Sequence, residues 1–104
     1  MNAEQQEVAL QLEDGTQGQA LRFVGEVLTL RCARPYPPGR PLSLIILASE
    51  PALSLSGRCI GSRRQDEDLY LVRVRLTNLR REDRQWLQAH LPLLVPQEAH
   101  GRPL

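Results

Sequence analysis

The sequence contains no lysine, and all thirteen of its basic residues are arginine. Twelve acidic residues oppose them, so the formal net charge is +1. Proteins that bind nucleic acid without sequence preference usually carry a large positive excess, because they must neutralise several phosphates. The near-neutral total therefore argues against strong non-specific binding to nucleic acid.

Aromatic residues are also scarce, and the four in the chain are Phe23, Tyr36, Tyr70 and Trp86. The core must therefore consist mainly of Leu, Val and Ile. Single-stranded nucleic acids are usually bound through exposed aromatic rings on which the bases stack. Tyr36, in a proline-rich loop, is the one ring that we expect to be exposed, so a small nucleic-acid-binding barrel is an alternative and not the first choice.

The residues that usually carry catalysis or bind metals lack the necessary spacing. There is no CxxC or HxxxH pattern, and the two histidines are His90 and His100. Cysteine–histidine catalysis would need Cys32 or Cys59 exposed beside His90, but both cysteines lie in apolar, strand-like runs. We therefore expect no enzyme, metal site or cofactor, and two buried free thiols, with a disulfide possible if their strands are neighbours.

Targeting and membrane-spanning signals are absent as well. The segment "MNAEQQEVAL" has neither a basic start nor an apolar run, so it does not resemble a signal peptide. The longest apolar stretch, 44–48, is too short to span a bilayer. These features predict a cytoplasmic protein without membrane insertion, and the length of 104 residues predicts a single domain, 1–104.

Alternation of apolar and polar residues dominates most of the chain, as is typical of half-buried strands. Strand-like runs occur at 7–12, 19–24, 26–32, 41–48, 53–62 and 69–77. Asp14-Gly15 is a tight-turn signal, and the charged segment 63–68 is expected to form a hairpin tip. The run 41–48 is apolar on both faces, so we expect its outer residues, Ile45 and Leu47, to be covered.

From Arg80 onwards the apolar residues no longer alternate with polar ones. Leu87, Leu91 and Leu94 recur at helical spacing beside Trp86, and prolines follow closely, which predicts a helix over about 80–91 and a flexible tail over 95–104. The fold class is therefore all-β: a six-stranded antiparallel barrel over about 6–77 with one C-terminal helix. The helix would cover either an opening of the barrel or the outer face of the strand at 41–48.

The layout resembles the PilZ domain family. The segment "EVLTLRCARPYPPGRPLSLIILASEPALSLSGRCI" is similar to the middle of that fold, "LYLVRVRLTNL" to its last barrel strand and "LRREDRQWLQAHL" to its closing helix. The resemblance spans roughly residues 7–91. It implies a bacterial protein, and a fold that in many members binds cyclic di-GMP.

The two cyclic di-GMP motifs of the family are missing. The RxxxR motif should precede the first strand, but residues 1–7 contain no arginine, and the chain's own RxxxR, at Arg80 and Arg84, falls on the predicted helix. The D/NxSxxG motif aligns with Arg22, Val24 and Val27, none of which matches. Because the phosphates need preplaced guanidinium groups, we expect no binding of this ligand.

Arginines cluster around the last strand. Arg73 and Arg75 occupy its outer face, Arg63 and Arg64 precede it, and Arg80, Arg81 and Arg84 follow it. One interpretation is a solvated face paired with the acids at 66–68 and 82–83. The other is a protein-docking surface, in which arginine is favoured. Candidate partner-binding residues are Tyr36, whose ring either packs on the barrel rim or serves as a preorganised anchor for a partner, and Arg73, Arg75, Arg81 and Arg84.

These observations predict a non-enzymatic adaptor that acts through protein–protein contacts. The PilZ resemblance implies a role in motility, type IV pili or cell polarity. Two alternatives remain: a cyclic di-GMP receptor that uses displaced arginines, such as Arg22 or Arg34, and a nucleic-acid-binding barrel. A homodimer formed through an edge strand or the helix is also possible.

Overall fold

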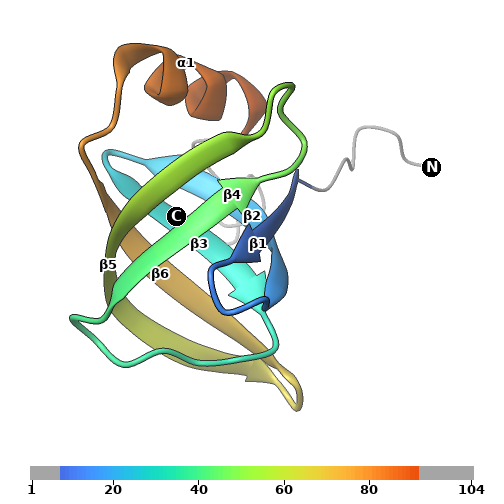
Figure 1. Ribbon diagram of the computed structural model, residues 1–104. Helices are drawn as coiled ribbons and strands as arrows, with labels where there is room; N and C mark the ends of the chain where they lie inside the picture. Colours follow the sequence, from blue (N-terminus) through green and yellow to red (C-terminus); the bar gives the residue numbers. More distant parts are fainter. Residues whose placement is uncertain (1–7, 92–104) are drawn as a thin grey trace, which may run out of the picture.

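The computed structural model describes residues 8–91, which form a closed antiparallel barrel with a helix across one end (Figure 1). Around the barrel the strand order is β1-β2-β3-β6-β5-β4. The elements are β1 (Val8–Leu12), β2 (Gln17–Val24), β3 (Val27–Cys32), β4 (Pro41–Ile46), β5 (Leu53–Asp66), β6 (Leu69–Thr77) and α1 (Arg81–His90). The predicted fold class and the order of its elements are confirmed, whereas residues 6–7 and the tail at 95–104 lie outside the described part.

Alternation of side chains decides which residues enter the barrel. Every second residue of a strand points inward, and the inward residues form one continuous core. Its fully covered members include Phe23, Leu28, Leu30, Ile46, Val72 and Val74. As predicted, aliphatic residues dominate this core, and they come from all six strands.

Two strands differ from their predicted extent. In β2 the pairing with β3 shifts between Ala20 and Arg22, so Leu21 occupies a β-bulge. Consequently Ala20 and Phe23 are both buried, whereas Leu21, which strict alternation would place on the face of Phe23, is only partly buried. In β5 the pairing continues to Asp66, which pairs with Leu69, so the predicted hairpin tip at 63–68 shrinks to a two-residue turn.

The barrel has no open edge within the described residues. β1 pairs with β2 on one side and with β4 on the other, where Leu10 lies opposite Ile46. Closure satisfies the backbone groups that an edge strand would expose. Residues 8–91 therefore offer no unpaired edge strand for the first of the two dimerisation routes that the sequence suggested.

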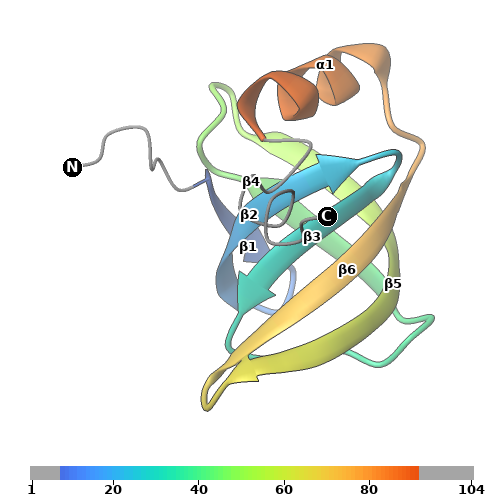
Figure 2. The same ribbon diagram turned by 180° about the vertical axis from the view of Figure 1, so that it is seen from behind.

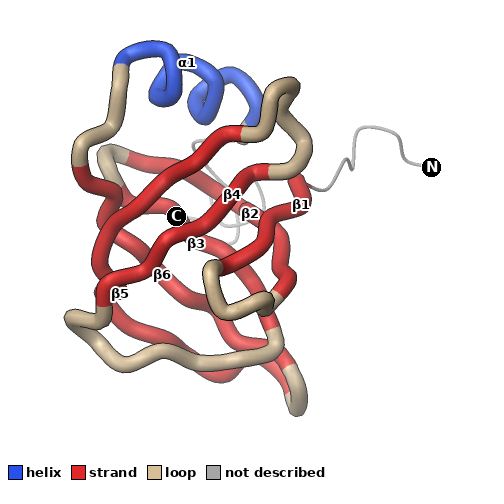
Figure 3. The backbone as a smooth tube through the Cα atoms, viewed as in Figure 1, coloured by secondary structure: helices blue, strands red, loops and turns tan. Residues whose placement is uncertain are grey.

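Helix α1 lies over one opening of the barrel, as Figure 3 shows in blue against the red strands. Leu87 and the following Leu91 are buried in the core, whereas Leu94 lies outside the described residues. On the outward side, the ring of His90 stacks on Trp86 with 4.0 Å between ring centroids, and His90 Nδ1 lies 2.9 Å from the Trp86 carbonyl oxygen. No described helix has the length and apolar character needed to cross a bilayer.

The outer side of β4 is not covered, contrary to the prediction. Ile45 is 41% exposed and Leu47, just after the strand, is 48% exposed. The inner row of the same strand, Leu42, Leu44 and Ile46, is buried. Helix α1 was expected to cover either a barrel opening or this outer face. It lies over the opening, because Leu87 packs into the core there.

The two cysteines are free and buried, as predicted. Cys32 ends β3 and Cys59 lies in β5, and β6 runs between these two strands. A disulfide was expected only if the strands of the two cysteines were neighbours, and these strands are not neighbours. Burial also raises the pKa of the Cys32 thiol, which disfavours the reactive thiolate.

Candidate functional site

The proline-rich loop at 33–40 closes the end of the barrel opposite to α1 (Figure 1). The Ser62 hydroxyl accepts a hydrogen bond from the Tyr36 backbone N–H and donates one to the Tyr36 carbonyl, both at 2.8 Å. The Cys32 thiol donates to the Arg34 carbonyl at 3.1 Å and the Cys59 thiol to the Tyr36 carbonyl at 3.4 Å. These contacts fix the loop to the barrel wall.

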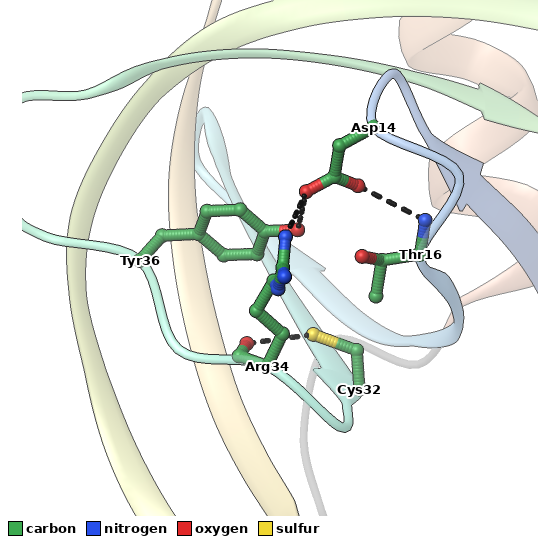
Figure 4. Close-up of polar contacts among 5 residues, drawn as sticks. All are labelled: Asp14, Thr16, Cys32, Arg34 and Tyr36. Atoms are coloured by element: carbon green, nitrogen blue, oxygen red, sulfur yellow. Dashed lines mark hydrogen bonds and ion pairs between the residues drawn. The ribbon is translucent and has the colours of Figure 1, made fainter.

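Asp14, in the β1–β2 turn, is the polar centre to which this loop is attached (Figure 4). Its Oδ2 accepts the Tyr36 hydroxyl at 2.9 Å and Arg34 Nη1 at 3.0 Å, while its Oδ1 accepts the Thr16 backbone N–H at 2.9 Å. The hydrogen bonds from Thr16, followed by those from Tyr36 and Arg34, hold the pKa of Asp14 well below its usual range. The predicted tight turn is confirmed, and Gly15 adopts a φ of +92° in it.

Tyr36 is not the exposed anchor that the sequence suggested. Its residue exposure is only 4%, and it belongs to the hydrophobic core. Burial is the main cause that raises the pKa of its phenol, and the neighbouring Asp14 carboxylate acts in the same direction. Tyr36 therefore plugs the barrel end, and its ring has almost no surface left for a partner.

The arginines gather instead on the outer surface of β2, β3, β6 and β5. The strand register arranges them in three rows across the sheet, which are Val27–Arg75–Arg58–Pro41, Arg22–Thr29–Arg73–Gly61 and Gln19–Arg31–Leu71–Arg63. We call Arg22, Arg31, Arg58, Arg63, Arg73 and Arg75 the arginine face. Figure 2 shows β2, β3 and β6 side by side on this side of the barrel.

The three rows contain no acidic residue. The ion pairs recorded within residues 8–91 lie elsewhere: Arg34 with Asp14, Arg80 with Glu82 and Arg84 with Glu26. Of the acids at 66–68 and 82–83 that were considered as partners, Glu82 pairs with Arg80, and no ion pair of Arg73 or Arg75 with any of them is recorded within residues 8–91. A net charge of +1 over the chain thus does not reveal that six arginines share one outer surface.

Like charges lie directly opposite each other on this face. Arg58 and Arg75 are cross-strand partners in the β5–β6 ladder, and both are exposed. A like-charge pair in this position destabilises a sheet by about 0.5 kcal/mol. The Arg58 guanidinium donates to the Gly39 carbonyl at 2.9 Å, and Arg31 donates to the Gln19 side chain at 2.7 Å. Neutral oxygens therefore orient these two arginines without cancelling their charge.

A hollow of about 580 Å³ lies within the arginine face. Arg22, Arg63 and Arg73 line it together with Thr29, Gly61 and Leu71. Part of the space exists because Gly61 follows a bulge in β5 and has no side chain, and a Cβ there would meet nothing within 4 Å. The hollow therefore combines three cationic groups with a small apolar and hydroxyl-bearing base.

Thr29 is the most buried polar residue of this face, with 7% exposure. It lines the hollow, and no hydrogen bond of its hydroxyl to another residue in the range 8–91 is recorded. A hydroxyl in such a position favours a hydrogen-bonding partner. Together with the surrounding guanidinium groups, it presents a polar recess that a group with acceptor oxygens would satisfy.

The two helical candidates are placed differently from Arg73 and Arg75. Arg84 binds Glu26 at 3.3 Å and reaches the Gly25 carbonyl, so it joins α1 to the β2–β3 turn. Arg81 is exposed at the start of α1. The structure thus brings Arg73 and Arg75 together on the arginine face. Arg84 makes a structural contact, and Arg81 lies on α1 away from that face.

A second hollow, of about 440 Å³, is lined by residues of β1, β4 and β5 and of the turn after β1. Figure 1 shows the strands β1, β4 and β5 on the side of the barrel that faces the viewer. Ile45 and a set of short polar side chains line it, namely Gln11, Ser43, Ser54 and Ser56. Apart from Glu13 at one end, the lining is uncharged. This surface has no arrangement of charged groups that would orient a ligand.

Sequence reasoning grouped Arg63 with Arg73 and Arg75, but it missed Arg22, Arg31 and Arg58 as members of the same site. Alternation placed Arg31 and Arg58 on the outer sides of their strands, so the signal for orientation was present. The strand order could not be predicted from alternation. In the structure β6 lies between β3 and β5, and this order brings together arginines that are distant in the sequence.

Comparisons with protein-family models, with curated proteins and with solved structures found no match to this chain. Among residues 8–91, no three metal-binding side chains gather to form a candidate ion site. The functional argument therefore depends on the surface geometry.

Proposed function

We propose that this protein is a non-enzymatic adaptor that recognises other proteins through the arginine face. The observation that carries the proposal is the set of three cross-strand rows that bring six arginines to one outer surface of the barrel. Arginine is enriched at protein interfaces because its planar head donates several hydrogen bonds. In line with the PilZ resemblance, the adaptor would act in the bacterial cytoplasm, in motility, type IV pilus or polarity control.

Cyclic di-GMP binding is not part of the proposal. The arginines of the chain's own RxxxR are already engaged, Arg80 with Glu82 and Arg84 with Glu26. The displaced candidate Arg34 is also engaged, because Asp14 holds it together with Tyr36. Receptor function with displaced arginines would have to use the arginine face, which makes it the alternative to test.

Nucleic-acid binding is also less well supported than protein binding. The rows of the arginine face contain no aromatic residue on which a base could stack. Of the four aromatic residues in the chain, Phe23 and Tyr36 are buried, and Tyr70 and Trp86 pack partly against the core.

The test compares two charge-matched double variants in affinity capture from the native host, with mass spectrometry to identify the proteins recovered. Arg73→Glu with Arg75→Glu reverses two charges on the arginine face, and Arg40→Glu with Arg80→Glu reverses two exposed charges elsewhere. The proposal expects loss of specific partners in the first variant alone. Recovery unchanged in both variants would refute it.

Calorimetry with cyclic di-GMP decides the alternative. The adaptor proposal expects no heat of binding at micromolar concentrations of the wild-type protein. Micromolar binding that Arg22→Ala or Arg73→Ala weakens would establish a receptor instead, whereas Arg34→Ala should then have little effect because Arg34 lies with Asp14 at the loop.

A further inference from the structure

We propose that this protein forms a homodimer of modest affinity, in which the outer surfaces of β1, β4 and β5 from two copies pack against each other around a twofold axis. We call this surface the neutral face, and the outward residues that define it are Gln11, Ser43, Ile45, Leu47, Ser54 and Ser56. The inference goes beyond the proposed function and does not depend on it, because the neutral face uses none of the six arginines of the arginine face.

The composition of the neutral face suits a second copy of the same chain. Charged residues make up 24% of the sequence, yet none of the six defining residues is charged, and Glu13 stands at one end of the hollow on this face. A twofold interface brings a patch against its own copy, so a patch with charges of one sign would repel itself. Serine hydroxyls and glutamine amides both donate and accept hydrogen bonds, so they can pair with groups of their own kind.

The neutral face also leaves large apolar side chains in water. Ile45 is 41% exposed and Leu47 is 48% exposed, and the remaining large hydrophobic residue exposed within residues 8–91 is Val24, at the end of β2. The Leu47 backbone N–H donates to the Ala9 carbonyl at 2.9 Å, so the pairing with β1 continues past the end of β4 and Leu47 keeps the side of Ile45. Removal of these two side chains from water favours association.

A protruding group and a hollow lie on the same face, which is the requirement for two identical surfaces to fit each other. Ser43, Ile45 and Leu47 follow one another at about 6.6 Å along an extended chain. The hollow of about 440 Å³ is lined by short serine side chains and by Ile45, whereas Leu47 lies outside its lining. An axis near Ile45 would place Leu47 of each copy in the hollow of the other. Because this exchange is reciprocal, the assembly closes at two copies.

The size of the neutral face limits the strength of the dimer. A stable interface takes about 20–30 residues from each partner, and the neutral face is smaller, so we expect a dissociation constant on the order of 100 µM. At about 10 µM the protein would then be mainly monomeric, and Ile45→Ala would cost little stability. When formed, the dimer presents two arginine faces, so that a partner with two matching sites would bind with increased avidity.

Sedimentation equilibrium of the protein from about 10 µM to about 1 mM measures the association. The wild type should fit a monomer–dimer equilibrium without larger species. Leu47→Glu places a charge in each hollow and should weaken the dimer at least about tenfold. Val24→Glu is the matched control, because Val24 is equally exposed at 48% but lies outside the neutral face, and its dimer should match that of the wild type. Thermal unfolding verifies that each variant folds, and Leu47→Ser serves if Leu47→Glu does not fold.

A second pair of variants tests the hollow without changing any charge. Ser54→Gln fills part of the hollow with a larger uncharged side chain and should weaken the dimer roughly tenfold. Thr77→Gln is its control, because Thr77 is exposed on the neighbouring strand β6 and does not line the hollow. The control should dimerise like the wild type.

Several outcomes would overturn the inference. A wild type that stays monomeric at about 1 mM would refute the dimer, and larger assemblies would exclude the twofold arrangement. A dimer that persists in folded Leu47→Glu, or that Val24→Glu disrupts equally, would place the interface elsewhere. If the wild type is monomeric and Leu47→Glu abolishes capture of a specific host protein, the neutral face belongs to that partner instead. None of these results alters the capture test with Arg73 and Arg75, so this inference can fail while the proposed function stands.

Discussion

The Tyr36 hydroxyl donates a hydrogen bond of 2.9 Å to the Asp14 carboxylate and so joins the proline-rich loop to the first β-turn, 22 residues away in the sequence. The same carboxylate oxygen accepts Arg34, so a single acidic group holds the end of the barrel closed. Asp14 and Tyr36 lie outside the arginine face, and this contact gives both of them a structural role.

Removal of the phenolic hydroxyl should therefore destabilise the protein. We expect Tyr36→Phe to lower the free energy of unfolding by about 1–2 kcal/mol, because a hydrogen bond to a charged acceptor is lost while the ring remains buried. Tyr70→Phe is the control, since no hydrogen bond of its hydroxyl is recorded within the described residues. Urea denaturation measures both, and equal stability of the two variants would contradict the role of the contact.

The Asp14 contact should also depend on pH. The folded state lowers the pKa of Asp14 below the value of about 3.9 for an unfolded chain, so its stabilisation is complete above roughly pH 5 and is lost as the pH falls towards the folded-state pKa. The difference in unfolding free energy between the wild type and Asp14→Asn should accordingly shrink below pH 4. Denaturant titrations from pH 2 to 7 measure this difference, and a constant value would exclude the carboxylate as its source.

Truncation of side chains on the two faces of β4 should destabilise the protein to very different extents. Leu44 is buried, so Leu44→Ala should cost about 2–5 kcal/mol through lost burial and a cavity. The adjacent Ile45 is 41% exposed, and Ile45→Ala should cost well under about 1 kcal/mol. Thermal unfolding of the pair provides the comparison. A large cost for Ile45→Ala, dependent on protein concentration, would indicate that another copy of the chain covers this face.

The arginine face should trade stability for binding. Arg75→Thr removes one member of a like-charge pair and places a residue with good strand propensity on an exposed strand, so we expect stability to rise by about 0.5 kcal/mol. The gain should diminish in high salt, which screens the repulsion. Chemical denaturation at low and high ionic strength tests this expectation, and a destabilised variant would show that Arg75 serves the fold.

Local patterns predicted most of the fold. Alternation located the six strands and identified their inner rows, such as Leu28 and Leu30 in β3, because the pleat places every second side chain in the core. Helical spacing identified Leu87 as the buried residue of α1. The bulge at Leu21 was not predicted, because an extra residue in one strand leaves no mark in a short polar and apolar pattern.

The candidate site was predicted only in part. The outward direction of Arg73 and Arg75 followed from their strand, but the exposure of Tyr36 was wrong, because burial of a loop residue depends on contacts with Asp14 and Ser62. The expected cover over Ile45 was wrong for a similar reason. An apolar outer face indicates that something could lie there, and it does not identify what does.

The sequence by itself determined that the chain forms short strands and one terminal helix, with its aliphatic residues inside, since the periods of the two structures differ and can be recognised within ten residues. Only the tertiary structure decided that β6 lies between β3 and β5, which unites six arginines on one face, and that Tyr36 is enclosed. Those relationships join residues far apart in the chain, and the free energy that selects among them comes from packing the whole barrel and not from any single segment.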